Sequence, residues 1–202
     1  MQKLIPFLTA LLFVSPSLLL AQQTLTGRVI SSQGEVTVLS ADGQRVQAAR
    51  GQAISVSDEI ETGVDGLLQI RFSSGLLLSL DCRTSLQLEP GITAGREVFN
   101  LTLRRGQLRL ITGEQNTVIH YLRTDAGLLA IDTPGADLAI ARNPGPDMFA
   151  AVYKGSARAR TNAGEMVLGV GGDFDFAALE PGNAPAGLQN MPARLGAQSN
   201  CR

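Results

Sequence analysis

The chain has 202 residues and an almost balanced charge, with 17 lysines and arginines against 18 aspartates and glutamates. It lacks the basic surplus of a general nucleic-acid binder, so we expect no nucleic-acid partner. The two cysteines and single histidine are too few for a typical structural zinc site, and we expect no metal and no cofactor.

Residues 1–21 have the order of a secretory signal peptide. Lys3 supplies a positive charge, an apolar stretch runs from Leu4 to Leu20, and Ala21 ends it before a polar pair. Two prolines inside the stretch disfavour a spanning helix, and no later apolar run is long enough to cross a bilayer. We therefore expect a periplasmic or secreted protein that does not span the membrane after cleavage.

Alternating polar and apolar residues dominate residues 22–179, which we expect to form one β domain. Such alternation puts apolar side chains on one face of a strand. The clearest runs are short and separated by glycine-bearing turns: Glu35–Leu39, Leu67–Phe72, Leu86–Leu88, Phe99–Leu103 and Gln107–Leu110. Many short strands at regular spacing predict an all-β fold of repeated antiparallel strands, either a β-sandwich or jelly roll or a short β-solenoid.

Two sequence elements recur within this domain. A glycine followed by an alternating strand begins at Gly34, at Gly106 and at Gly155, and a Gly-Leu-Leu-x-Ile core occupies both 66–70 and 127–131. The recurrence predicts duplicated or stacked supersecondary units. Residues 180–202 have turn and linker composition, and we expect them to form an irregular C-terminal tail.

Cys82 and Cys201 are the two cysteines. Export would place them in an oxidising compartment, where pairing is the default expectation. A bridge would pin the tail to the domain and contribute up to about 4–5 kcal/mol in the chain-entropy model. The alternative is one buried thiol and one free thiol in the tail.

One segment is similar to a catalytic motif. Residues 132–137, Asp-Thr-Pro-Gly-Ala-Asp, resemble the Asp-Thr-Gly-Ala-Asp loop of retroviral-type aspartic proteases, which need two aspartates that share a proton. Pro134 stands where the loop requires glycine, and proline fixes φ and removes an amide donor. His120, the only histidine, has strand-like neighbours and no serine elbow to serve. We therefore predict a protein without catalytic residues, and an aspartic-type hydrolase is the alternative.

Arg104, Arg105 and Arg109 form the densest basic cluster. Alternation places Arg105 and Arg109 on one face of a strand and Arg104 on the other, subject to the turn at Gly106. Because arginine forks suit carboxylates and phosphates, these three residues are our candidates for contact with a partner protein or an anionic glycan. A solvated, salt-bridged face is the alternative.

Several short steps, taken in order, resemble the FecR-type domain, an exported β-rich module. They are a Gly-x-Val-x-Val strand, an Asp-x-Ile-x-Thr step, two strands around a Ser-Gly turn, a Leu-x-x-Gly-x-Leu-Arg step, a Thr-Pro step and a Val-x-x-Gly strand, within Gly34–Val38, Val56–Thr62, Leu68–Leu78, Leu103–Arg109, Ile131–Arg142 and Val152–Gly155. The chain departs from the family pattern after Arg142, where Asn143 and Pro144 follow in place of Gly-Thr.

The resemblance implies an exported module that binds a partner. Regulatory members resemble a transmembrane signalling protein with a cytoplasmic segment that controls a sigma factor, and we expect the exported domain here without that output. Our leading expectation is a non-catalytic binding or scaffold module of the cell envelope, with an unknown envelope protein as partner, through exposed strand edges. A polysaccharide- or peptidoglycan-binding module is the main alternative.

Overall fold

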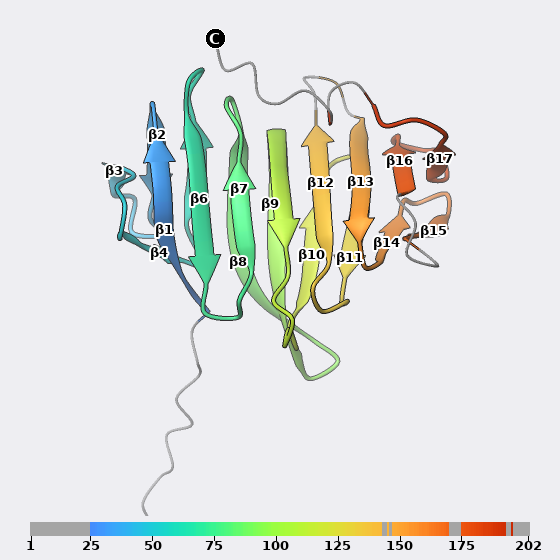
Figure 1. Cartoon of the computed structure of the whole chain (residues 1–202), viewed down its shortest axis with the longest axis horizontal. Helices are drawn as coiled ribbons and strands as arrows, with labels where there is room; N and C mark the ends of the chain where they lie inside the picture. The colour runs from blue at the N-terminus through green and yellow to red at the C-terminus, as the bar shows by residue number, and fades with distance from the viewer. Residues whose placement is uncertain (1–24, 143–144, 146, 170–174, 193–194, 196–202) are drawn as a thin grey trace, which may run out of the picture.

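The computed structural model describes residues 25–142, 145, 147–169, 175–192 and 195, and every element within them is a strand (Figure 1). The predicted signal segment and Cys201 lie outside the described residues. The pairing of Cys201 with Cys82 therefore stays a prediction.

The strands form two sheets that face each other across one core. Sheet A consists, in spatial order, of β4 (Ala53–Ser55), β1 (Thr26–Gln33), β6 (Leu67–Phe72), β7 (Leu77–Leu80), the second part of β9 (Arg96–Ile111), β12 (Asp137–Arg142), β13 (Met148–Lys154), β16 (Asp175–Leu179) and β17 (Ala186–Leu188). Sheet B consists of β3 (Arg45–Gln47), β2 (Val36–Leu39), β5 (Glu59–Thr62), β8 (Ser85–Thr93), the first part of β9, β10 (Ile119–Arg123), β11 (Leu128–Ile131), β14 (Ala157–Arg160) and β15 (Glu165–Leu168).

β9 belongs to both sheets and is the middle strand of each. Its first part pairs with β8 and β10, and its second part pairs with β7 and β12. The change of sheet takes place at Gly106, which has a φ of 93°. A Cβ at this position would approach the Oγ1 atom of Thr84 to 2.3 Å, so both the backbone conformation and the space require glycine.

The two layers confirm the predicted all-β, sandwich-like class. Alternate residues of each strand point inward, as Leu68, Ile70 and Phe72 do from β6, and they form one buried cluster. Phe72 of sheet A meets Phe99 of sheet B edge to face, with 5.0 Å between ring centroids. One pair departs from the predicted antiparallel pattern, because β9 and β10 run parallel.

The glycine-strand repeat has a common structural meaning. Gly34, Gly106 and Gly155 all have positive φ values, of 64°, 93° and 78°, and at each of them the chain passes from one sheet to the other. The two copies of the Gly-Leu-Leu-x-Ile repeat do not share a structural role. Residues 66–70 enter β6 of sheet A after a change of sheet, whereas residues 127–131 form the second strand of a hairpin within sheet B. The pattern recurs because an alternating strand after a glycine turn suits both situations.

At two changes of sheet, the hydroxyl of a buried threonine forms hydrogen bonds with the backbone of the turn. The hydroxyl of Thr84 donates to the carbonyl of Gln107 (3.0 Å) and accepts from its amide (3.1 Å). The hydroxyl of Thr112 likewise donates to the Thr133 carbonyl (2.8 Å) and accepts from the Ala136 amide (2.8 Å). Each hydroxyl therefore bonds both a carbonyl and an amide of the buried backbone, and the Gln107 carbonyl also accepts from the Asp81 amide (3.0 Å).

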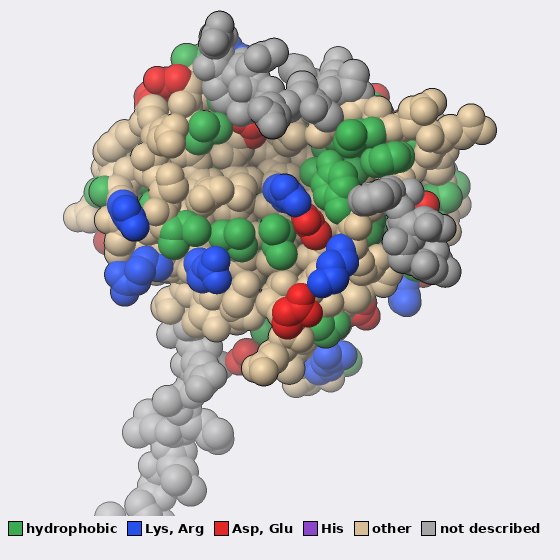
Figure 2. All heavy atoms as spheres, in the orientation of Figure 1, with side chains coloured by type: hydrophobic (Ala, Val, Ile, Leu, Met, Phe, Trp, Pro, Cys, Tyr) green, Lys and Arg blue, Asp and Glu red, His purple; other side chains and the backbone are tan. Residues whose placement is uncertain are grey.

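The segment predicted as an irregular tail contains a strand and covers part of sheet A. β17 lies within it and pairs with β16 at the sheet edge. Further along, Leu195 is 6% exposed and packs with Ala139, Ala141 and Ala151 on the outer face. Figure 2 shows hydrophobic side chains gathered over β12, β13 and β16 on this face. Because these strands are apolar on both faces, the segment gains a surface to pack on, which its turn-rich composition does not reveal.

Candidate binding surface

The structure separates the three predicted contact arginines. Arg104 and Arg105 lie on the outer face of sheet B, where a bulge opposite Ser85 exposes both. Arg109 lies beyond Gly106, on the outer face of sheet A. The expectation that Arg105 and Arg109 share a face is wrong, because β9 changes sheet between them.

All three of these arginines have acidic partners. Arg104 approaches Glu59 (3.5 Å) and donates to the Gln87 amide oxygen (2.7 Å), and Arg105 approaches Glu61 (3.3 Å). Arg109 donates two hydrogen bonds to Asp137, at 2.8 and 2.6 Å, and these raise the pKa of Arg109 above its ordinary value. The geometry is that of the salt-bridged face that the sequence left as an alternative.

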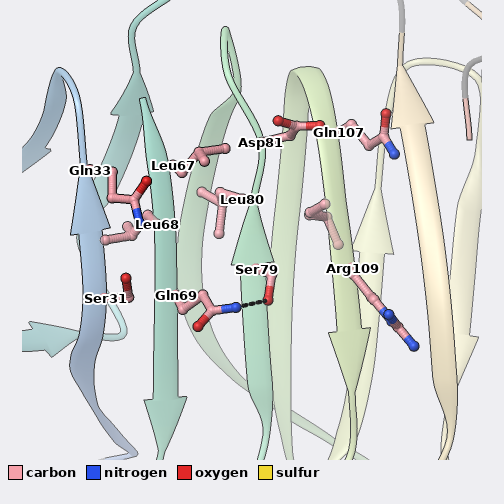
Figure 3. A pocket seen from close by; sticks show the side chains of 11 residues that line it. Ser31, Gln33, Leu67, Leu68, Gln69, Ser79, Leu80, Asp81, Gln107 and Arg109 are labelled. Atoms are coloured by element: carbon pink, nitrogen blue, oxygen red, sulfur yellow. Dashed lines mark hydrogen bonds between the residues drawn. The ribbon is translucent and has the colours of Figure 1, made fainter. Parts of the chain in front are cut away.

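A hollow of about 340 Å³, lined by both leucine and polar side chains, lies on the outer face of sheet A (Figure 3). Amides and hydroxyls from β1, β6 and β7 line it, and Gln69 donates to the hydroxyl of Ser79 (3.4 Å). Asp81 lies at its border at the top of Figure 3, and Arg109 lies at its border on the right. Because Arg109 is already engaged by Asp137, the hollow does not direct an available guanidinium at a ligand.

A different set of arginines lies on the outer face of sheet B, on the far side of β9. We call Arg123, Arg158 and Arg160 the C-terminal arginine patch. Arg158 pairs with Glu165 (3.3 Å), and the guanidinium of Arg123 lies 5.7 Å from the centroid of the Tyr121 ring. Within the described part of the chain, neither Arg123 nor Arg160 has an ion-pair partner.

Two hollows adjoin this patch. One, of about 370 Å³, lies over β10, β11 and β14, and the other, of about 530 Å³, lies among the turns that follow β10 and β14. Arg123, Leu128 and Arg160 line both of them. Sequence reasoning missed the patch because Arg123 and Arg160 are far apart in the chain, and only the Arg-x-Arg alternation at 158–160 hints at it.

Arg142 crosses from sheet A to this end of sheet B. Its side chain is 13% exposed, and its guanidinium donates to the Leu103 carbonyl (3.4 Å) and to the carboxylate of Asp125. Asp125 is one of the two acidic residues that line the hollows. Arg142 and Arg158 form the ion pairs with these two carboxylates, although Glu165 also lies opposite Arg160 in the strand register.

The residues considered for catalysis, Asp132 and His120, lie in different environments, one exposed and the other buried. Asp132 is exposed in the turn between β11 and β12, and the hydroxyl of Thr133 hydrogen-bonds Ser156 (2.8 Å to Oγ) across the change of sheet. His120 is completely buried on the inner face of β10, 6.2 Å from Phe99 between ring centroids. Burial lowers the pKa of His120 to about 4, against an opposing effect of the Ile131 backbone.

Four short strands form the edges of the two sheets, namely β3, β4, β15 and β17. Among them, β15 lies next to the C-terminal arginine patch, and its Val167 is 49% exposed. An edge strand of this kind presents unpaired backbone groups to which another chain can add.

Comparison with solved structures shows the fold alone. The chain is similar to the 1.65 Å crystal structure of a protein from Parabacteroides distasonis to which the role of an anti-sigma factor has been assigned. The TM-score is 0.52 and the identity 14%, over 64% of this chain and 58% of that chain. A second crystal structure of such a protein from the same organism, at 2.50 Å, gives a TM-score of 0.52 at 13% identity over the same shares. The chain thus matches less than two thirds of the length of each of these two structures.

No family model matches the chain. No curated protein matches it either. In the part of the chain that the structure describes, no helix combines the length and the hydropathy needed to cross a bilayer.

Proposed function

We propose that this chain is a non-catalytic, exported module of the cell envelope that binds a protein partner in signalling. The observation that carries the proposal is the C-terminal arginine patch. Arginine and tyrosine are enriched at the energetic centres of protein interfaces. Here Arg123, Arg160 and Tyr121 stand together on the outer face of sheet B, beside the edge strand β15.

Three further observations support the proposal. The order of charge, apolar stretch and small residue in 1–21 favours export to the periplasm or beyond. The ordered sequence steps resemble the FecR-type domain, to which we assign the chain as part of the proposal. The fold is similar to that of structures described as anti-sigma factors, and such a likeness adds only a weak argument for function.

The absence of a catalytic role is also part of the proposal. Asp132 is exposed in the turn between β11 and β12, and Asp137 of the same segment is bound by Arg109. His120 is sealed inside the core, where it cannot meet a substrate without opening of the sheets. Both facts favour a structural role for the residues that resemble catalytic ones.

Site-specific crosslinking in cells tests the proposed function. A photoreactive residue, p-benzoylphenylalanine, replaces Leu128 at the centre of the patch. In a matched control it replaces Leu39, which is also a half-buried leucine on the outer face of sheet B. We expect irradiation to give one dominant protein adduct, identified by mass spectrometry, from position 128 and none from position 39.

Two outcomes would contradict the proposal. Adducts of equal yield and identity at both positions would mean that the patch has no special part in binding. Adducts that contain glycan and no protein would favour the polysaccharide- or peptidoglycan-binding alternative.

A further inference from the structure

Arg123 and Arg160 lie on either side of one leucine. The strand register places Arg123 opposite Leu128 and Leu128 opposite Arg160, so the three residues form a row across β10, β11 and β14. With neighbouring strands about 4.8 Å apart, the two arginine Cα atoms are separated by about 10 Å. Both side chains are exposed on the same face and are long enough to converge over Leu128.

The charges around this row are unequal. The two hollows are lined by three arginines, Arg123, Arg158 and Arg160, and by two acidic residues, Asp125 and Glu165. Asp125 binds Arg142, and Glu165 binds Arg158. Glu165 is also the cross-strand neighbour of Arg160. With Arg142 counted, four arginines share these two carboxylates, so two positive charges remain in excess. An anion placed between Arg123 and Arg160 would relieve their repulsion and gain two charge-assisted hydrogen-bonding partners.

We propose that Arg123 and Arg160 act as an arginine clamp that binds the carboxylate side chains of an acidic, extended peptide segment. This inference rests on the proposed function and specifies the chemistry of the partner. Carboxylates match the planar, forked donors of arginine. The row ends on β15 at Glu165, which pairs with Arg158, and the edge of β15 allows an extended chain to lie alongside.

The surroundings of the clamp favour a peptide over a sugar chain. The ring that a sugar could stack on is that of Tyr121, and the guanidinium of Arg123 already lies over it. Leu128 lies between the two arginines, and Ala130 lies beside it along β11. Their small apolar surfaces suit the aliphatic parts of a peptide. An anionic glycan is therefore an outcome of the test and not the ligand we assign.

Binding of labelled probes to the purified chain, residues 22–202, tests the clamp. The probe is a fluorescent octapeptide of alternating glutamate and threonine, measured by fluorescence anisotropy. The same peptide with glutamine in place of glutamate is the neutral control, and oligogalacturonate is the carboxylate-bearing glycan control. We expect binding of the glutamate peptide alone.

Two double variants give the decisive comparison. The clamp variant carries Arg123→Gln and Arg160→Gln. The charge-matched control carries Arg104→Gln and Arg105→Gln, which lie on the outer face of the same sheet but already have acidic partners. We expect the clamp variant to bind the glutamate peptide about tenfold more weakly, as loss of charge-assisted hydrogen bonds implies, and the control to differ by less than about twofold.

The outcomes separate the clamp from the proposed function. Equal weakening in both double variants, no binding of the glutamate peptide, or stronger binding of oligogalacturonate would each overturn the clamp. If a protein adduct still forms at position 128 in cells that carry the clamp variant, the partner function stands without the clamp. If no protein adduct forms at position 128 in the parent chain, the proposed function fails whatever the peptide does.

Discussion

The two halves of sheet B, on either side of β9, both expose arginines, but they differ in how many of these arginines form ion pairs. On the N-terminal side, Glu59 and Glu61 approach Arg104, Arg105 and Arg45 within 3.5 Å. On the C-terminal side, Glu165 serves Arg158, while Arg123 and Arg160 have no ion-pair partner among the described residues. The ion pairs formed between strands, rather than the density of arginines along the chain, thus decide which guanidiniums lack a bound carboxylate.

The halves also share a construction principle. Threonine hydroxyls hold the changes of sheet on both sides, with Thr84 at one position and Thr112 at the other. The framework is therefore common to the two halves, and their difference lies in the side chains that the framework presents. The following predictions test this separation of framework from surface.

The largest effect is expected where the halves join. Gly106→Ala would force a side chain into a φ of 93° and against the backbone of Thr84, whose Cα lies 2.5 Å from the new atom. We expect the free energy of unfolding to fall by about 3–5 kcal/mol in urea denaturation, from strain and overpacking together. Gly95→Ala is the control, since Gly95 also has a positive φ but open space around it, and should cost about 1 kcal/mol. Equal losses would show that the contact with Thr84 is not what requires glycine.

The next effect is confined to the C-terminal half and depends on pH. The pKa of His120 is about 4 in the folded chain and near 6.5 when unfolded, so the unfolded state takes up the proton first. Above about pH 6.5 the histidine is neutral in both states and does not destabilise the fold. As the pH falls from 6.5 towards 4, protonation of the unfolded state lowers the free energy of unfolding by about 3 kcal/mol in all.

The variant His120→Leu isolates this contribution. Between pH 7 and 4.5, the unfolding free energy of the variant should fall less than that of the parent chain, measured by urea denaturation at each pH. The burial of Asp58 raises the pKa of that carboxyl and acts in the opposite direction, but it is common to both proteins and cancels in the difference. Parallel pH profiles would mean that the ring is solvated in the folded state.

The smallest effect separates the two sets of arginines directly. The control double variant Arg104→Gln/Arg105→Gln removes two exposed ion pairs, and we expect it to lower the unfolding free energy by no more than about 1 kcal/mol at low salt. The clamp variant removes unpaired charges, and its stability should stay within about 0.5 kcal/mol of the parent. Thermal unfolding at low and high salt measures both. A larger loss in the clamp variant would mean that Arg123 or Arg160 has a structural role.

The sequence predicts the strands well where alternation is strict and the turns are ordinary. Leu67–Phe72 is β6 as expected. The prediction from sequence fails where a glycine bends a strand instead of ending it. The runs Phe99–Leu103 and Gln107–Leu110 belong to one strand, β9, which is part of both sheets. A positive φ at glycine fits either a turn or a bend, and only the long-range packing of Thr84 selects between them.

The same limit applies to the candidate surface. The face of each arginine depends on the path of the strand, and the path of β9 separates Arg105 from Arg109. The row of Arg123, Leu128 and Arg160 depends on the register of three strands, and a shift of one residue would turn these side chains to the other face. Residue spacing carries no information about that register.

A strand that runs through both layers also has a mechanical consequence. A pull on β8 or β10 of sheet B reaches β7 and β12 of sheet A through the covalent backbone of β9. Two layers joined only by apolar contacts can slide when loaded in shear, whereas these two are tied at their centre by peptide bonds. A partner that exerts force on one sheet therefore transmits that force to the other sheet through β9.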